Sequence, residues 1–120
     1  SFPYMNRPFL LILLCFLISA AGCHKQNDQA AERIKVVMKK YSFEPSVIHV
    51  KAGQTTELDI TTADVQHGFD VPDLGIKEPV HPGQTAVVML KSPAKGEYNV
   101  VCGIICGPHH DDMNAKLVVE

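Results

Sequence analysis

The sequence predicts an all-β domain built as a β-sandwich. About seven short segments from residue 33 onward carry the apolar and β-branched residues typical of strands. Glycine or proline stands between most of them, as turns between strands require. No twelve-residue window in this part shows the 3.6-residue apolar period of an amphipathic helix. Short strands separated by turns, without helices, are typical of two packed sheets.

The expected strands follow one another from the start of the domain. After Arg33, the apolar residues Ile34, Val36 and Met38 alternate with charged or less apolar positions, as in a half-buried strand. A β-branched run at residues 47–50 ends at a turn signal that contains Gly53. The other expected strands are residues 55–62, 68–71, 85–90, 98–101 and 115–119.

Length and charge limit the classes of function. A chain of 120 residues holds one domain at most. It carries 11 basic and 13 acidic residues, a formal net charge of −2. Removal of residues 1–22 takes away one arginine and leaves 10 basic against 13 acidic residues, a net charge of −3. We therefore expect no nucleic-acid partner, because proteins that bind nucleic acids carry basic surfaces.

Residues 1–22 are expected to be a lipoprotein-type signal peptide that starts at Met5. Arg7 supplies a positive charge, and residues 9–21 form an unbroken run of 13 apolar or small residues. This run is shorter than the roughly 20 residues that span a bilayer. The sequence Ala20-Ala-Gly-Cys23 resembles the lipobox of bacterial lipoproteins, although leucine usually stands in place of Ala20.

The lipobox implies that Cys23 carries the lipid and begins the mature protein. An ordinary secretory signal, with Cys23 unmodified, is the alternative. Residues 23–32 are polar without an apolar period, so they are expected to be a lipidated tether. Residues 33–120 then form the domain. With Cys15 in the signal and Cys23 modified, only Cys102 and Cys106 remain as thiols.

Residues 102–113 hold the most informative motif. Two cysteines, a histidine and a methionine follow the spacing Cys-x3-Cys-x3-His-x2-Met, at Cys102, Cys106, His110 and Met113. Sulfur with imidazole is a soft donor set, which favours copper over calcium, magnesium or manganese. Glycine and proline cost roughly 1 and 3 kcal/mol in a helix interior, so the two glycines and the proline in this stretch favour a loop. The motif indicates a metal site in a loop.

Two other interpretations use the thiols alone. Cys102 and Cys106 could form a disulfide in an exported protein, or a redox-active pair like that of thioredoxin-type copper chaperones. A disulfide gives no role to His110 and Met113. The thioredoxin interpretation requires strands that alternate with helices, and this pattern is absent from the sequence.

The motif also resembles a known family. The loop, with Gly96-Glu-Tyr98 before it and Leu117-Val-Val-Glu120 after it, resembles the dinuclear copper (CuA) loop of haem–copper oxidase subunit II and nitrous oxide reductase. Residues 64–77, followed by Pro82-Gly83, resemble the segment of subunit II that supplies an upstream histidine, His67 here. Weaker similarity extends from about Ile34. The resemblance implies a Greek-key cupredoxin sandwich with its loops gathered at one end.

The resemblance also implies the metal and its ligands. Two copper ions would be bridged by the sulfurs of Cys102 and Cys106, and His67 and His110 would each cap one copper. The Met113 thioether and the backbone carbonyl of Ile104 would be weak ligands, one on each side. His109 replaces His110 if the register of the loop is shifted by one residue. All of these ligands come from the protein, which favours electron transfer over catalysis.

Other residues near the motif are expected to have lesser roles. His49 and His81 should face solvent. Asp64 should order the loop before His67 through hydrogen bonds. Asp111 and Asp112 could steer a cationic partner, but a solvated turn is the simpler interpretation.

The chain departs from the oxidase pattern in several places. No membrane-spanning helix is expected after processing. Ile104 stands where the oxidase carries a glutamate that serves a metal site at the junction with the catalytic subunit. No tryptophan is present, so the aromatic position through which electrons reach the oxidase copper is unfilled. The propeller domain of nitrous oxide reductase is also missing from the sequence.

We therefore expect a lipid-anchored, CuA-type cupredoxin in a bacterial cell envelope, on the periplasmic side of a membrane. It would transfer single electrons, with no enzymatic activity of its own outside an oxidase-type complex. Its partners would be a c-type cytochrome or a terminal oxidase, and a copper chaperone or thiol reductant for loading. The alternatives are a copper carrier for oxidase assembly and a divergent oxidase subunit anchored by lipid.

Overall fold

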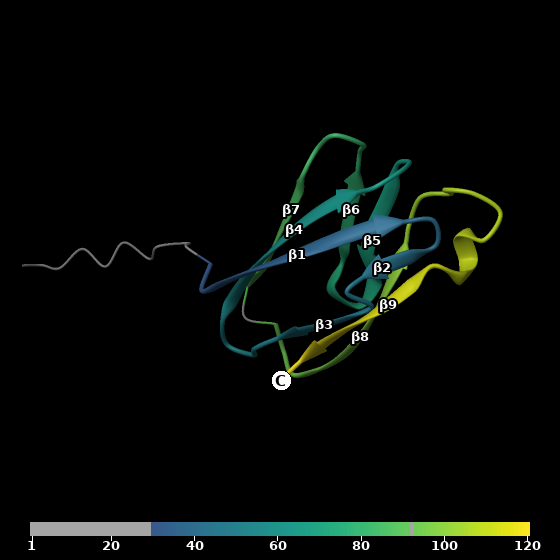
Figure 1. The fold of residues 1–120 in the computed structure, drawn as a ribbon. Helices are drawn as coiled ribbons and strands as arrows, with labels where there is room; N and C mark the ends of the chain where they lie inside the picture. The colour runs from purple at the N-terminus through teal and green to yellow at the C-terminus, as the bar shows by residue number, and fades with distance from the viewer. Residues whose placement is uncertain (1–29, 92) are drawn as a thin grey trace, which may run out of the picture.

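The computed structural model describes residues 30–91 and 93–120, which form two β-sheets packed face to face (Figure 1). The expected signal peptide, its start at Met5 and the lipidated Cys23 lie outside the described residues. The first strand begins at Glu32, close to the expected start of the domain at residue 33. Within the described residues, no helix has the length and apolarity needed to cross a bilayer.

The described residues form nine strands and two short 3-10 turns. The strands are β1 (Glu32–Lys39), β2 (Ser42–Glu44), β3 (Val47–Val50), β4 (Thr55–Thr62), β5 (His67–Val71), β6 (Ile76–Val80), β7 (Ala86–Lys91), β8 (Gly96–Cys102) and β9 (Asn114–Val119). The turns are η1 (Pro72–Leu74) and η2 (His110–Asp112). One sheet has the strand order β2-β1-β4-β7 and the other has the order β3-β9-β8-β5-β6.

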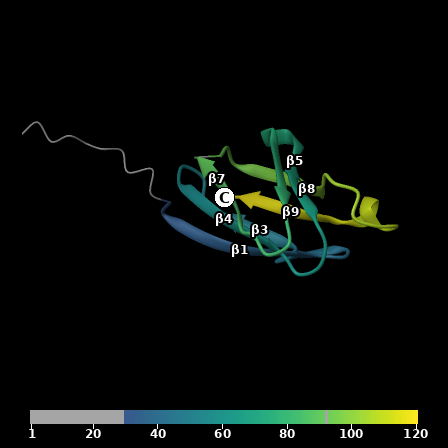
Figure 2. The same cartoon turned by 90° about the horizontal axis from the view of Figure 1, so that it is seen from above.

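The chain passes between the two sheets several times (Figure 2). Strands β1 and β4 pair in parallel, as do β3 and β9, whereas the remaining pairs are antiparallel. A parallel pair cannot be joined by a tight hairpin and needs a longer crossover connection. The crossovers of this chain run through the opposite sheet. The predicted all-β sandwich of two packed sheets is confirmed.

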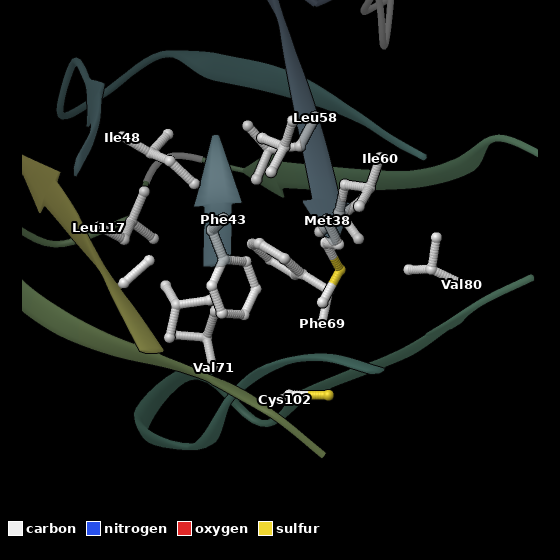
Figure 3. Packing of buried hydrophobic residues seen from close by; sticks show 14 of the residues in the cluster. Met38, Phe43, Ile48, Leu58, Ile60, Phe69, Val71, Val80, Cys102 and Leu117 are labelled. Atoms are coloured by element: carbon white, nitrogen blue, oxygen red, sulfur yellow. The ribbon is translucent and has the colours of Figure 1, made fainter. Parts of the chain in front are cut away.

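The core lies between the inner faces of the sheets, because buried residues alternate with more exposed ones along most of the strands. The inward residues of β1 are Val36 and Met38, as the sequence pattern predicts, and both are fully buried. Phe43 and Phe69 meet edge to face near the centre, with ring centroids 6.1 Å apart. Figure 3 shows these rings among the aliphatic side chains, with Cys102 at the margin of the same cluster.

Two strands have no counterpart in the sequence prediction. Strand β2 is only three residues long, with Phe43 as its single buried residue. Strand β6 contains Pro79 and lies at the edge of its sheet, where a missing N–H is tolerated. Strand β5 also begins one residue earlier than expected, at His67. Because His67 belongs to β5, the pairing of β5 with β8 determines where its side chain lies.

Candidate metal centre

The site begins where two neighbouring strands of one sheet meet. His67 is the first residue of β5 and Cys102 is the last residue of β8, and these strands pair antiparallel with Phe69 opposite Cys102. Both side chains are buried, His67 completely. Nδ1 of His67 lies 3.8 Å from Sγ of Cys102. The pairing of the strands therefore brings together two residues that are 35 positions apart in sequence.

The β8–β9 loop supplies a second imidazole–sulfur pair. Sγ of Cys106 lies 3.7 Å from Sγ of Cys102, 3.8 Å from Nδ1 of His110 and 3.9 Å from Sδ of Met113. Cys106 and Met113 are buried, whereas His110, the first residue of η2, is partly exposed. Neither cysteine forms a disulfide in the described part of the chain. The two thiols face each other across the centre of the site.

The carbonyl oxygen of Ile104 completes the group of predicted donors. It lies 3.1 Å from Sγ of Cys102, whose thiol donates a hydrogen bond to it. The isoleucine side chain points elsewhere: a Cβ built on Gly68 would lie 3.1 Å from Cγ1 of Ile104. The structure thus brings all six residues predicted for the site, His67, Cys102, Ile104, Cys106, His110 and Met113, to one end of the sandwich.

The remaining histidines of the described part lie apart from the sulfurs. His109 is 67% exposed at its side chain, and its ring meets Tyr41 edge to face at 5.2 Å. His49 and His81 are exposed, as expected from the sequence. Asp111 and Asp112 are exposed in η2. The loop therefore presents His110, rather than its neighbour His109, to Cys106.

Asp64 orders the loop before His67. Its carboxylate accepts hydrogen bonds from the backbone N–H groups of Lys40 at 2.7 Å and Val65 at 2.6 Å. It also lies 2.7 Å from Nε2 of His67, so the ring donates its N–H to Asp64 and turns Nδ1 toward Cys102. Burial raises the pKa of Asp64, but the hydrogen bonds from Lys40, Val65 and His67 outweigh burial and lower the pKa to about 2.

The thiols are held in an apolar environment. Burial raises the pKa of Cys106 to about 11, and the adjacent Cys102 thiol adds to the rise. Without a cation, Cys106 is therefore a neutral thiol at neutral pH. A buried thiolate is costly unless a positive charge compensates it, and a metal ion supplies this charge as the proton leaves. The environment of Cys106 therefore favours a protonated or metal-bound sulfur over a free thiolate.

Glycines let the loop approach strand β5 closely. A Cβ on Gly68 would press on the backbone nitrogens of Gly103 and Ile104, each 3.1 Å away. A Cβ on Gly103 would overlap the carboxylate of Asp70. The sequence analysis used Gly103 only as evidence for a loop and gave Gly68 no role. A glycine inside a strand is the signal that could have identified Gly68, because such a residue often marks a close approach of another backbone.

The donor set matches the preferences of copper. Ligand atoms of His67, Cys102 and Cys106 all lie within 4.8 Å of one another, and each is buried. A second imidazole and a thioether lie beside Cys106, at His110 and Met113. Thiolate, imidazole and thioether donors favour copper, whereas magnesium and calcium prefer oxygen. The residues present therefore fit a copper centre.

Comparisons with known proteins agree with this chemistry. A scan against protein families matches residues 9–119 to the family described as "Cupredoxin-like domain". Cytochrome c oxidase subunit 2 of Thermus thermophilus is 32% identical over 87 residues, which cover 72% of this chain and 64% of that protein. A second Thermus thermophilus sequence is covered to 52%. The chain thus spans about half to two thirds of the length of these relatives.

Solved structures show the same fold. The periplasmic domain of subunit II of the Bradyrhizobium japonicum cytochrome oxidase superposes with a TM-score of 0.69 at 20% identity, covering 77% of this chain and 86% of that one. Subunit II of a cytochrome c oxidase, in a mixed disulfide with a thioredoxin-like protein, superposes with a TM-score of 0.64 at 19% identity, covering 77% and 83%. The chain belongs to the Cupredoxin-like domain family, and its domain is related to cytochrome c oxidase subunit 2.

Proposed function

We propose that this protein is an electron-transfer domain with a dinuclear copper centre. The sulfurs of Cys102 and Cys106 and the imidazoles of His67 and His110 would hold the copper pair as its principal ligands. The Met113 thioether and the Ile104 carbonyl would be weak ligands. When bound, the copper pair supplies a one-electron redox couple.

The observation that carries this proposal is the paired arrangement around the two sulfurs. Each sulfur has one imidazole nitrogen at 3.8 Å, and the sulfurs themselves are 3.7 Å apart. Each sulfur also has one weak donor beside it, the Ile104 oxygen at 3.1 Å from Cys102 or the Met113 sulfur at 3.9 Å from Cys106. A mononuclear blue-copper site uses one cysteine with two histidines and a weak axial ligand. The second cysteine therefore supports two metals rather than one.

The surroundings of the site suit electron transfer. His67, Cys102, Cys106 and Met113 are buried, so most of the ligand shell is shielded from water. Two thiolates offset much of the metal charge, which keeps the cost of burying the centre small. Every proposed ligand comes from the chain itself, so a substrate would find no free position. A centre enclosed in this way exchanges electrons without binding a reactant.

We further propose the domain division and location. Residues 1–22 form a lipoprotein signal, Cys23 carries a lipid, residues 23–32 form a tether, and residues 33–120 form the cupredoxin domain on the periplasmic side of a bacterial membrane. The relation to cytochrome c oxidase subunit 2 supports a c-type cytochrome or a terminal oxidase as redox partner.

Loading of the centre requires a thiol reductant or a copper chaperone. The sulfurs of Cys102 and Cys106 lie 3.7 Å apart, and a small movement would bring them to the disulfide bond length of about 2.05 Å. In an oxidising compartment the pair would lose two electrons and two protons and form a disulfide. A partner protein with two thiols would return the two electrons and two protons, and its own thiols would form a disulfide. The mixed disulfide of a related subunit with a thioredoxin-like protein supports this partner class.

Single substitutions test the ligand set. Cys102→Ser and Cys106→Ser should each abolish a two-copper centre, because each sulfur bridges both metals. His110→Ala should destroy the paired centre, whereas the matched variant His109→Ala should retain two coppers per chain, measured by metal analysis after copper loading. The reverse result for the two histidines would place the ligand at His109.

A copper-transfer assay separates the electron carrier from a copper carrier. The loaded protein is mixed with a copper-free oxidase domain while the optical spectrum is followed. An electron carrier should keep both coppers through repeated one-electron reduction and oxidation. Stoichiometric loss of copper to the acceptor, without a stable coloured form of the donor, would favour the copper carrier.

A further inference from the structure

The turn between β1 and β2 contacts both segments that carry the proposed ligands. On one side, the N–H of Lys40 donates to Asp64, which holds the ring of His67. On the other side, Tyr41 lies against Gly107 and His109 of the β8–β9 loop. Figure 1 shows this turn at the same end of the sandwich as that loop. One short turn therefore touches the histidine side and the cysteine side of the site.

The contact of Tyr41 with the loop is close. Its half-buried ring packs against the hydrophobic core, and this contact holds the ring in position. A Cβ built on Gly107 would overlap the Tyr41 hydroxyl and would lie 3.2 Å from the ring carbons Cε1 and Cζ. The ring of His109 stands edge-on to Tyr41 at 5.2 Å, with an interplanar angle of 78°. The loop backbone at Gly107 is thus in direct contact with the side chain of Tyr41.

The backbone at Gly107 determines where His110 begins its turn. The N–H of His110 donates to the carbonyl of Gly107 at 3.2 Å, and the N–H of Met113 donates to the carbonyl of His110 at 3.2 Å. These bonds form the short 3-10 turn η2, which follows Cys106 and precedes Met113. A shift of Gly107 would therefore move His110 and Met113 relative to Cys106.

We propose that Tyr41 is a positioning residue for the Cys106–His110–Met113 side of the site. Its ring, fixed by the core, supports the loop at Gly107 and sets the distance between His110 and Cys106. The proposal rests on the ligand set of the proposed function. Groups that orient metal ligands typically change metal affinity by roughly 10- to 100-fold when they are removed, so the effect should be measurable.

The first test needs no copper. Amide hydrogen exchange is measured on the reduced, metal-free, full-length chain in detergent. Tyr41→Ala should speed the exchange of the His110 and Met113 amides by about tenfold or more, because local opening of the loop becomes easier. Tyr98→Ala is the matched control: this tyrosine is also half-buried, and its hydroxyl donates to the Ala94 carbonyl at 2.7 Å, away from the loop. It should leave these two amides unchanged.

The second test examines the contact itself. Gly107→Ala in the native background should disturb the optical spectrum of the copper-loaded protein, because the added Cβ overlaps Tyr41 and the φ of +152° strains any residue other than glycine. In the Tyr41→Phe background the same change should have a smaller effect, because the overlapping hydroxyl is gone. Tyr41→Phe alone should keep the native spectrum, since the supporting ring remains. Tyr41→Ala should bind copper about tenfold more weakly than the native protein, measured by competition with a chelator.

The outcomes distinguish this inference from the proposed function. Unchanged amide exchange in a folded Tyr41→Ala protein, or equal changes in Tyr98→Ala, would overturn the positioning role whatever metal is bound. If Tyr41→Ala does not fold, equal effects of Gly107→Ala in the native and Tyr41→Phe backgrounds would overturn it instead. A protein that binds one copper but shows the predicted exchange would refute the dinuclear proposal alone.

Discussion

At the scale of single residues, Asp64 connects the stability of the domain to pH. Its folded pKa of about 2 lies below the ordinary value of 3.8. The ionised form therefore stabilises the folded protein fully above about pH 4, and this contribution is lost as pH falls through about 2. Asp64→Asn should flatten the dependence of unfolding free energy on pH in this range, measured by urea unfolding.

An exposed carboxylate provides the control for this prediction. Asp73 lies in η1, away from the loops that carry the site. Asp73→Asn should retain the native loss of stability between about pH 4 and pH 2. An equal flattening in both variants would show that Asp64 is not the group responsible.

Met113 offers a test of weak ligation. Its side chain is buried, with Sδ 3.9 Å from the sulfur of Cys106. Met113→Leu nearly conserves volume and should cost less than about 1.5 kcal/mol of stability. The variant should keep two coppers and mainly change the reduction potential, measured by voltammetry and metal analysis. Loss of one copper from a folded variant would show that the thioether is a principal ligand.

Some residues of the site can be predicted from the sequence, and others cannot. The ligand candidates of the loop follow from their spacing in residues 102–113, because soft donors at short intervals already indicate a metal. The roles of Tyr41 and Gly103 depend on contacts with Gly107 and Asp70, which are distant in sequence. Only the three-dimensional fold brings these residues together, so the local pattern carries no signal for them.

At the scale of elements, the close approach of the β8–β9 loop to β5 gives a prediction about Gly68. A methyl group there would press on the backbone nitrogens of Gly103 and Ile104. Overpacking costs typically 1–3 kcal/mol, which exceeds the gain of about 0.4–1 kcal/mol from a less flexible unfolded chain. Gly68→Ala should therefore lower the urea midpoint and change the copper spectrum.

Gly53 provides the contrast. It lies in a turn with φ of +74° and has open space where a Cβ would stand. Gly53→Ala should lower stability through backbone strain while leaving the copper spectrum native. If the two variants affected the spectrum equally, the spectral change could not be assigned to the loop contact.

The strands themselves were predictable to different degrees. The alternation of β1 and the β-branched run of β3 identified these elements, because each buries every second side chain. Strand β2 has three residues, too few for an alternation to be recognised. Strand β6 contains Lys77, Glu78 and Pro79, which argue against a strand in isolation. The antiparallel pairing with β5 at the sheet edge overrides that local preference.

At the scale of the whole molecule, the proposed lipid anchor predicts where the protein resides. If Cys23 carries the only anchor, Cys23→Ser should release the protein from the membrane fraction of its host. The serine cannot form the thioether to the lipid. Cys15→Ser, within the proposed signal, is the control and should leave membrane association unchanged. Continued membrane association of Cys23→Ser would mean that the signal is not of the lipoprotein type or that another protein retains the domain.

The most direct test of the dinuclear centre combines copper analysis with an electron paramagnetic resonance spectrum of the oxidised, copper-loaded protein. The paired arrangement of two cysteines and two histidines predicts two coppers per chain and a purple colour. It also predicts one unpaired electron shared between two copper nuclei. A single copper per chain, with the unpaired electron localised on one nucleus, would contradict the dinuclear centre.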